Sequence, residues 1–386
     1  MSAPLSAAAT PAPSLLRSTT RVAWFLLGAL FIFSGLIKLN DPVGTALKLE
    51  EYFDVFAVDL PALDGLFRSL GGSSRLLSIL LSSLEVILGA ALLLRWYLRQ
   101  TLWVLLALLV FFTFLTFYSA ALNKVTDCGC FGDFVKLTPW TSFAKDLFLL
   151  LLWFVVFSNQ RFLRHSFVQG TTGIMTMTFV TAIAIGIGVR ALGHLPYFDF
   201  LPYKVGNNIG QLMKPAEPAR YNYTFEHNGE TKVFNEFPTD TTWKYKSMQT
   251  LNSKESTPVI TDFGVSDENG NSYTQELLKG NKLVLIVQNT NKTDRDRFAE
   301  INKLLNSVGK SRKNITAITI TSTSPGKFDT FRHEMNIATP YYFADATVLK
   351  SIVRSNPGLM VLQDGVVRAK YHYHDIPELF EVEKAL

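Results

Sequence analysis

Five long apolar stretches in the first half of the chain restrict its fold more than any other feature of the sequence. They cover residues 22–37, 76–94, 102–118, 143–157 and 174–192. Each is close to the roughly 17–25 residues that a helix needs to cross a lipid bilayer. Because a segment inside hydrocarbon must satisfy its own backbone hydrogen bonds, helices are the expected form of all five. The sequence therefore predicts an α-helical membrane bundle.

The composition changes after about residue 205, where Asn, Thr, Lys and Asp take over from the apolar residues. Hydrophobic residues still make up 48% of the whole chain, which is high for a soluble protein. We expect a disordered cytoplasmic tail (1–20), a transmembrane domain (21–193), a linker with a small β-rich hairpin module (194–256) and a soluble domain (257–386). The basic residues are scattered among acids, a pattern that argues against a nucleic-acid partner.

The charges between the apolar stretches predict which way the bundle faces. Three flanking segments carry arginine and no acid: Arg17 and Arg21, Arg95 and Arg99, and Arg161 and Arg164. The alternate loops, 38–75 and 119–142, hold the acidic residues. By the positive-inside rule the N-terminus is cytoplasmic and the C-terminal half lies outside, which in a bacterium is the periplasm. No small-x-small cleavage signature follows the first stretch, so we expect a retained helix in the inner membrane.

The two cysteines of the chain, Cys128 and Cys130, lie together in "VTDCGCFGDF", within the outer loop between the third and fourth stretches. A disulfide that closes so short a loop removes little entropy from the unfolded chain, so it is a poor structural staple. Strained disulfides tend to be the labile, catalytic ones. We interpret the pair as a redox-active dithiol, and an inert structural bond stays open as the alternative. A metal site is disfavoured, because zinc needs four ligands and the loop adds only Asp127 and Asp133.

The fourth stretch opens with signals for the start of a helix. Thr138 is the expected N-cap and Pro139 the first helical residue. The positive end of that helix would favour a thiolate if the cysteine loop folds back toward it. Lys145 and Asp146, two turns later, are assigned to the membrane interface.

Glu85 lies at mid-depth of the second stretch, where an ionisable side chain is costly and suggests a functional site. The alternative is a structural role, either a hydrogen bond between helices or an ion pair with Lys38 at the end of the first stretch. The outer loop that follows Lys38 has apolar residues at i, i+3, i+4 and i+7, which predicts a short amphipathic helix along the membrane surface. These residues are Leu49, Tyr52, Phe53 and Phe56.

Several of these segments resemble the DoxX/MauE-like redox-associated membrane proteins. The resemblance covers residues 20–160 and rests on "CGCFGD" before "PWTSFAKD", on "SGLIKLNDPVGTALKLEEYF" after the first helix, and on Glu85. It implies a four-helix membrane core linked to thiol–disulfide or quinone-coupled electron transfer, distantly similar to the vitamin K epoxide reductase fold. Those reductases use a C-x-x-C pair with further cysteines, whereas this chain has C-x-C alone. On this resemblance Lys38 and Glu85 are candidate cofactor-binding residues, with a quinone as the candidate cofactor.

The second half of the chain predicts two β-containing parts. "RYNYTFEHNGETKVF" alternates around an Asn-Gly turn and indicates a β-hairpin, with "DTTWKYKSMQTLN" as a further strand. From Thr257 onward, a strand pair in "TPVITDFGVSDENGNSY" precedes alternating strands and helices. "KLVLIVQNT" and "ITAITITS" are buried strands, each followed by a helix, and Asp294 is a candidate N-cap. The chain closes with a hairpin in "NPGLMVLQDGVVRAKYHY", an order that indicates an α/β domain.

This order resembles thioredoxin-like domains of the peroxiredoxin and thiol-reductase type. Pro357 matches the cis-proline of that family, and the segment around Thr293 matches the place of its active-site cysteines. No thiol is present there, so thiol chemistry by this domain alone is excluded. The resemblance leaves a docking role for Thr293, Asn356 and Pro357. His372 and His374 alternate along the last strand, and we expect an exposed strand face there rather than a metal site.

The sequence as a whole predicts an inner-membrane protein that exchanges electrons through Cys128 and Cys130 with a periplasmic or envelope protein partner. One alternative is a non-catalytic membrane scaffold whose degenerate thioredoxin-like domain binds envelope proteins. Another is a protein that binds quinone or membrane lipid through Glu85. Enzymatic turnover and association of two copies stay open.

Overall fold

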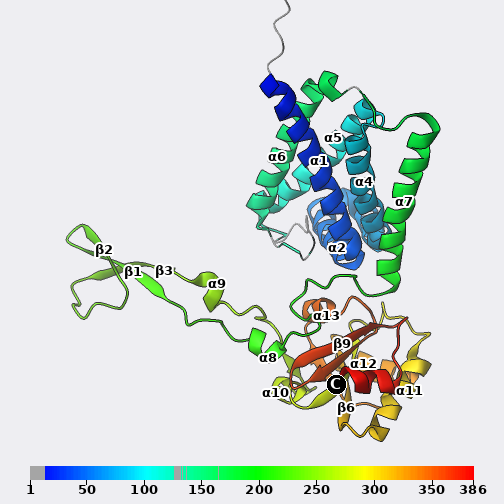
Figure 1. The fold of residues 1–386 in the computed structure, drawn as a ribbon. Helices are drawn as coiled ribbons and strands as arrows, with labels where there is room; N and C mark the ends of the chain where they lie inside the picture. The colour runs from blue at the N-terminus through cyan, green and yellow to red at the C-terminus, as the bar shows by residue number, and fades with distance from the viewer. Residues whose placement is uncertain (1–13, 126–131, 133, 136, 164) are drawn as a thin grey trace, which may run out of the picture. The chain divides into compact units, whose positions relative to one another are not determined.

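The computed structural model describes all of the chain except residues 1–13, 126–131, 133, 136 and 164. It divides into two compact units, Met1–Phe198 and Asp199–Leu386 (Figure 1). Cys128 and Cys130, on which the redox prediction depends, lie outside the described residues.

The first unit contains the predicted membrane helices. Within the described residues, five helices are long and apolar enough to cross a membrane: α1 (Ser14–Asn40), α4 (Ser74–Leu94), α5 (Leu98–Leu122), α6 (Pro139–Ser158) and α7 (Gly170–Gly193). The multi-pass membrane prediction is confirmed. The predicted tail of residues 1–20 is wrong for its last part, because α1 already begins at Ser14. Its polar residues continue the helix, since the hydroxyls of Thr19 and Thr20 donate to backbone carbonyls one turn earlier.

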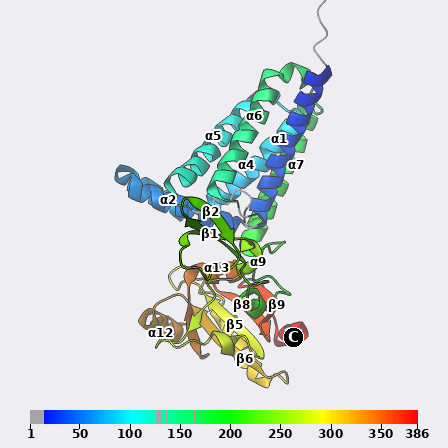
Figure 2. The same ribbon diagram turned by 90° about the vertical axis from the view of Figure 1, so that its left-hand side faces the viewer.

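Four of these helices form the predicted core. Apolar side chains of α1, α4, α5 and α6 pack into one cluster that includes Leu27, Leu92, Leu105 and Trp153. The fifth helix, α7, packs beside α1 and α4 through a smaller cluster with Ala184 (Figures 1 and 2). The first unit is therefore a four-helix core with one additional helix.

Helices α1 and α4 approach one another closely because glycines line their contact. A Cβ atom at Gly89 would lie 2.7 Å from the carbonyl oxygen of Gly28, and one at Gly35 would lie 2.7 Å from the carbonyl oxygen of Ser82. Small residues at such contacts let helix backbones pack tightly in membranes. The tight contact fixes the distance between the two helices that carry Lys38 and Glu85.

The predicted amphipathic helix is α2 (Pro42–Asp59), which crosses one end of the bundle (Figure 2). Asp41 caps it, with its side chain accepting from the backbone N–H of Gly44. Leu49, Tyr52 and Phe56 are buried, so the predicted apolar face is confirmed. Short helices η1 (Pro61–Leu63) and α3 (Asp64–Gly72) lead from it to α4, and η2 (Gln160–Leu163) follows α6.

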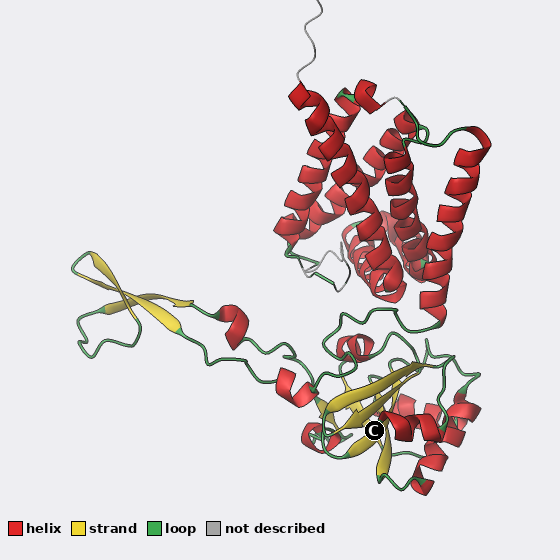
Figure 3. Cartoon of the chain, in the orientation of Figure 1, coloured by secondary structure: helices red, strands yellow, loops and turns green. Residues whose placement is uncertain are grey.

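The second unit contains the predicted α/β domain, built on a six-stranded sheet of order β4-β7-β6-β5-β8-β9 (Figure 3). Its strands are β4 (Val265–Ser266), β5 (Asn281–Val287), β6 (Ile315–Thr321), β7 (Tyr341–Ala344), β8 (Gly358–Gln363) and β9 (Val366–His372). Strands β5, β6 and β7 are parallel to one another, and β8 runs antiparallel to β5. Strand β9 pairs antiparallel with β8, so the two form a terminal hairpin. This βαβ unit followed by a hairpin is the thioredoxin-like order, and the predicted fold class is confirmed.

Helices cover both faces of this sheet. The helices are α10 (Thr274–Leu277), α11 (Phe298–Ser307), η3 (Val308–Lys310), α12 (Pro325–Glu334), α13 (Ala346–Ile352) and α14 (Leu379–Ala385). Leu283, Leu285 and Val287 of β5 share one core with α11, α12 and α14. Because side chains alternate along a strand, the intervening residues of β5 face the other side, and they are buried too.

A separate three-stranded sheet confirms the predicted hairpin module. Its order is β2-β1-β3, with β1 (Tyr221–His227), β2 (Glu230–Phe234) and β3 (Lys244–Thr250). Asn228 and Gly229 form the turn with φ of +51° and +85°, which an Asn-Gly pair adopts at little cost. The short helices α8 (Ile209–Leu212) and α9 (Ser253–Ser256) lie before and after this sheet in the sequence.

The start of the second unit differs from the predicted linker. Residues 206–209 pair with the end of the sheet: the N–H of Val367 donates to the carbonyl of Asn207, and the N–H of Ile209 donates to the carbonyl of Gly365. The outer edge of β9 would otherwise present unpaired backbone groups. Part of the segment 194–256 therefore belongs to the α/β domain, although the predicted boundary of that domain was residue 257.

Three smaller predictions are corrected. Helix α11 begins at Phe298, so Asp294 is not its N-cap; its carboxylate accepts from the N–H of Asp296 instead. The strand pair expected before β5 is reduced to β4 and an isolated bridge between Ser266 and Ser272. The expected exposed strand face is wrong for His372, which is 2% exposed at the end of β9, whereas His374 is exposed in the turn that follows.

Candidate functional site

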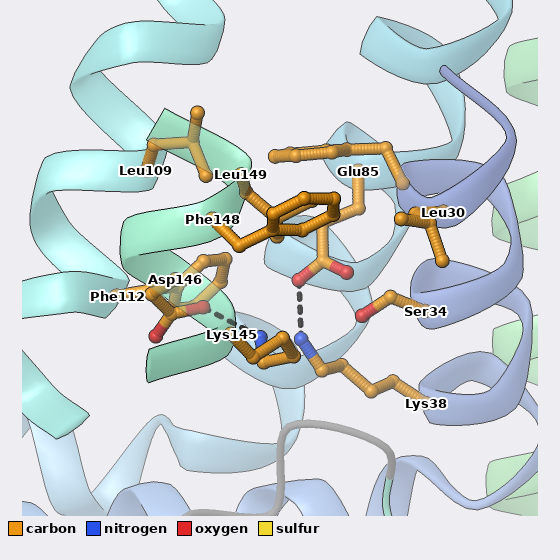
Figure 4. A pocket seen from close by; sticks show the side chains of 11 residues that line it. Leu30, Ser34, Lys38, Glu85, Leu109, Phe112, Lys145, Asp146, Phe148 and Leu149 are labelled. Carbon is orange, nitrogen blue, oxygen red and sulfur yellow. Dashed lines mark hydrogen bonds and ion pairs between the residues drawn. The ribbon is translucent and has the colours of Figure 1, made fainter. Parts of the chain in front are cut away.

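Lys38 and Glu85 form a buried ion pair inside the membrane bundle. Lys38 lies near the end of α1 and Glu85 in the middle of α4, with Nζ and Oε1 2.5 Å apart (Figure 4). Their side chains are 9% and 2% exposed. The ammonium group also lies 4.5 Å from the ring centroid of Phe112. Because a single buried charge is costly, each side chain makes the other tolerable in an apolar bundle. The pairing named as an alternative from the sequence is present.

A second ion pair faces the same space from α6. Lys145 Nζ lies 2.5 Å from Asp146 Oδ1, and the hydroxyl of Thr116 on α5 donates to Asp146 Oδ2 at 2.8 Å. Asp146 is 1% exposed, so its side chain lies in the interior of the bundle. A signal for this was present in the sequence. Asp146 falls on the stripe of α6 residues 142, 146, 149, 153 and 156, whose spacing of three and four marks one buried helix face.

Two small cavities lie on either side of the ion pair of Lys38 and Glu85. The first has a volume of about 50 Å³ and is bounded by α1, α4, α5 and α6 (Figure 4). Its polar lining consists of Ser34, Lys38, Glu85, Lys145 and Asp146, and its apolar lining includes Phe112 and Phe148. The second also has a volume of about 50 Å³ and is bounded by α1, α2, α4 and α5. Lys38, Glu85 and Phe112 line both cavities.

The first cavity suits a quinone in chemistry but not in size. Its apolar walls and ammonium donors are the kind of lining that binds a lipophilic carbonyl compound. Pockets for small molecules usually measure about 300–1,000 Å³, however, far more than is present here. The residues do not fit a bound quinone in this structure, and we derive no chemical step through one.

The residues before the cysteine segment are tied to α2. Lys124 and Tyr118 both donate to the carboxylate of Asp59 at the end of α2. The hydrogen bond from Lys124, and then that from Tyr118, lowers the pKa of Asp59 below its ordinary value. Val125 is fully buried beside α2, and its carbonyl accepts from the hydroxyl of Ser119. The chain is thus anchored up to the last described residue before the cysteines.

The residues after the cysteine segment contact α1. Gly132 has a φ of +51°, and a Cβ built there would lie 3.6 Å from the side chain of Ile37. Phe134 packs edge-on against Phe33, with ring centroids 5.7 Å apart. Ile37 directly precedes Lys38, so this contact is at the same end of the bundle as the buried ion pair. The predicted start of α6 is confirmed, with Thr138 as N-cap and Pro139 as first residue.

The thioredoxin-like domain brings its three predicted docking residues together. The peptide bond between Asn356 and Pro357 is cis, as the resemblance implies. The side chain of Asn356 accepts from the N–H of Gln288 and donates to the carbonyl of Asn289. These bonds join the cis-proline turn to the loop that carries Thr293. Pro357 itself is buried, and Thr293 is half-buried.

The described residues offer no alternative metal centre: they contain no group of three or more His, Cys, Asp or Glu side chains that could hold an ion. His372 accepts at Nδ1 from the N–H of His374. The two histidines therefore contact one another locally at the end of β9.

The bundle also matches a known family. Residues 16–158 match the model for methylamine utilisation protein MauE. These residues form a MauE-like membrane domain. The match ends with the last residue of α6, so the MauE-like domain comprises the four-helix core, α2 and α3, and includes both buried ion pairs. Helix α7 and the whole second unit lie beyond it.

Two solved structures are similar to parts of the chain. A candidate electron transfer protein from Aquifex aeolicus is 17% identical, over 32% of this chain and 90% of that chain, with a TM-score of 0.26. A thiol peroxidase from Chromobacterium violaceum is 14% identical, over 42% of this chain and 94% of that chain, with a TM-score of 0.24. The order and direction of the strands in the six-stranded sheet show the thioredoxin-like fold of the second unit. No curated protein matches the chain.

Proposed function

We propose that this protein is a thiol–disulfide exchange protein of the bacterial inner membrane. Cys128 and Cys130 cycle between dithiol and disulfide and exchange electrons with an envelope protein partner. The observation that carries the proposal is the anchoring of both flanks of the cysteine segment at the Lys38 end of the MauE-like domain. The described residues on both sides of the cysteines are thus held at one end of the domain, which suits a thiol pair that must meet a partner in a defined place.

The exchange follows ordinary thiol–disulfide chemistry. A thiolate of the pair attacks a disulfide of the partner, so one S–S bond forms between the proteins and the partner's own bond breaks. The second cysteine then attacks the mixed disulfide and releases the partner as a dithiol. The partner is reduced by two electrons and the Cys128 and Cys130 pair is oxidised to a disulfide. The reverse sequence oxidises the partner.

The second unit supplies partner recognition in this proposal. The arginine distribution among the loops supports a periplasmic location for it. Its thioredoxin-like domain has no cysteine, so it acts by binding, through the surface around Thr293, Asn356 and Pro357. In this division of roles, the second unit binds the partner and the membrane domain exchanges electrons with it.

Thiol trapping in intact cells tests the exchange. A maleimide reagent that shifts gel mobility reports the redox state of the pair under stepped redox buffers. We expect a midpoint in the periplasmic range, and mixed-disulfide adducts in Cys128→Ser or Cys130→Ser, because a lone cysteine cannot resolve the intermediate. The Cys128→Ser/Cys130→Ser double variant should form no adduct. If that double variant fully supports the protein's cellular role, the proposal is wrong.

The second candidate function is a membrane scaffold without redox turnover. The absence of a thiol in residues 288–294, where thioredoxin-like enzymes carry their cysteines, favours a binding role for the second unit. A Cys128 and Cys130 pair that stays oxidised under strong reductant, with no adduct in either single variant, would favour the scaffold. In that case pull-down of partners should depend on Asn356 and should not depend on either cysteine.

A further inference from the structure

Ser82 on α4 has a buried hydroxyl that its protein surroundings leave unsatisfied. It is 0% exposed, and its Oγ has no hydrogen-bond partner among the residues that the structure describes. A buried polar group without a partner is unfavourable, and ordered water often fills that role. Ser82 lines the cavity bounded by α1, α2, α4 and α5. The hydroxyl therefore points to water in that cavity.

Both cavities have the size and polarity to hold water. A water molecule needs roughly 10–15 Å³ of such space and two to four polar partners. Each cavity has about 50 Å³, which is room for several molecules. The polar side chains that line the cavity on the Ser82 side are Lys38, Thr45, Lys48, Tyr52, Ser82, Glu85 and Thr116.

The ion pair of Lys38 and Glu85 connects the two cavities because both residues line both of them. At one end of the combined space, Lys48 of α2 is 32% exposed and pairs with Glu51. At the other end, the carboxylate of Asp146 on α6 is buried. Beyond Glu85 the buried face of α4 continues with Val86, Leu88 and Leu92, which are apolar. The polar space therefore occupies the half of the bundle next to α2.

We propose that both cavities hold water and that Glu85 joins them into a proton path from the α2 surface to Asp146. A hydronium ion in the cavity next to α2 gives its proton to the Glu85 carboxylate, so a carboxyl O–H bond forms as the hydronium O–H bond breaks. Glu85 returns the proton to water in the cavity bounded by α6, and the Asp146 carboxylate accepts it there. No oxidant or reductant takes part, so the path is independent of the cysteine chemistry.

The charged groups around Glu85 suit this role. Lys38 faces it from α1, Lys48 and Tyr52 from α2, and Lys145 and Asp146 from α6, while α5 contributes the hydroxyl of Thr116. Lys38 and Lys145 keep the unprotonated carboxylates neutralised between transfers. Without such partners a carboxylate at this depth would be strongly disfavoured.

Radiolytic water footprinting of the full-length protein in lipid nanodiscs tests for the water. X-rays generate hydroxyl radicals from bound water, which oxidise neighbouring side chains. We expect Leu81 and Leu115, which line the Ser82 cavity, to be oxidised severalfold faster than Leu102 and Leu105, which are buried in the apolar core. Equal, slow oxidation of all four would mean dry cavities and would overturn the proposal.

A matched pair of serine variants sharpens this test. Ser82→Ala should lower oxidation of Leu81 severalfold, because it removes a partner of the cavity water. Ser83→Ala is the control: its hydroxyl is equally buried and unpartnered among the described residues, but it lines neither cavity. Equal effects of the two variants would contradict the assignment of water to Ser82.

Infrared titration tests the proton path itself. We expect a carboxyl band that grows as the bulk pH falls and shifts within seconds of transfer to D2O. Glu85→Gln should remove it, whereas Glu51→Gln, in the partly exposed pair with Lys48, should not. If Glu85→Gln does not fold, Glu85→Asp should shift the band instead of removing it. A Glu85 carboxyl that ignores bulk pH and D2O for hours would overturn the path. The Cys128→Ser/Cys130→Ser variant should give the same spectra.

Discussion

Lys124 donates a hydrogen bond to the carboxylate of Asp59, and this contact fastens the end of the third membrane helix to the end of α2. Tyr118 donates to the other oxygen of the same carboxylate. Lys124 and Asp59 are far apart in the sequence, yet their contact fixes the chain four residues before Cys128. Helix α2 therefore sets the position of the last described residues before the cysteines.

Asp59→Asn should loosen this attachment. The amide keeps the size of the side chain but loses the charge that both donors use. Hydrogen exchange of the backbone amides in 119–125 should become several times faster, while the rest of the bundle is unchanged. Asp64→Asn, which breaks the exposed pair with Arg68, is the matched control and should leave 119–125 as it was. Unchanged exchange in Asp59→Asn would show that burial of Val125 alone holds the segment.

The same attachment should depend on pH in a defined direction. The pKa of Asp59 is lowered in the folded protein, so its stabilising effect is complete above the ordinary carboxyl value of about 4. The effect is lost only as the pH falls through the lowered folded value. Once the pH dependence of the intrinsic exchange rate is corrected for, hydrogen exchange of the backbone amides in 119–125 should thus stay slow from pH 7 to about 4. Loosening that begins well above that pH would contradict the carboxylate as the anchor.

Removing one member of the buried ion pair should cost more than removing both. Lys38→Met leaves Glu85 as an uncompensated buried charge, and such losses typically amount to about 3–5 kcal/mol. The double variant Lys38→Met/Glu85→Leu should recover most of the unfolding free energy. Lys48→Met, from the partly exposed pair with Glu51, should change it by less than about 1 kcal/mol. Steric-trapping measurements in bicelles give these values, and additive effects of the two single changes would refute the coupling.

Gly89→Ala should destabilise the bundle through the contact of α1 with α4. The new methyl group would lie 2.7 Å from the carbonyl oxygen of Gly28, and overpacking of this kind costs about 1–3 kcal/mol. Gly186→Ala on α7 is the control, because a Cβ there meets nothing within 4 Å. Since both changes raise helix propensity equally, the difference between their melting temperatures isolates the packing. A Gly89→Ala protein as stable as Gly186→Ala would mean that the helices can separate freely.

Asn356→Ala should weaken the joint between the cis-proline turn and the loop before α11. It leaves the N–H of Gln288 without its partner, which costs about 1–3 kcal/mol for a buried donor. Asn291→Ala in the same loop, where the side chain is exposed, should stay within about 0.5 kcal/mol of the wild type. Chemical unfolding monitored by circular dichroism distinguishes the two, and equal effects would assign no special role to Asn356.

Local patterns in the sequence predicted the elements well because each depends on nearby residues. The five apolar stretches, the capped start of α6 at Thr138 and the Asn-Gly turn at Asn228 are all fixed by short-range chemistry. The burial of Asp146 could also have been predicted, because its helical spacing to Ser142 and Leu149 places it on the inner face. The charge of Asp146 suggested a place at the membrane interface, whereas its spacing along the helix indicates the buried face.

Contacts between distant segments could not be predicted in the same way. Nothing in the sequence specifies that Asp59 meets Lys124, or that Asn356 fastens the loop of Gln288. Lys38 and Glu85 could be named as a candidate pair only because two charges in a membrane need partners. The pairing of residues 206–209 with β9 depended on an open sheet edge, which exists only once the sheet has formed.

That last pairing decides how the soluble half of this protein can be produced by itself. A fragment that starts at residue 257 would lack the segment that covers β9 and would leave an unpaired strand edge, which favours aggregation. It would also lose Asp199, the ion-pair partner of Lys370 on the same strand. A fragment that starts at Asp199 retains both. Expression trials should therefore begin immediately after the membrane helices rather than at the apparent start of the α/β domain.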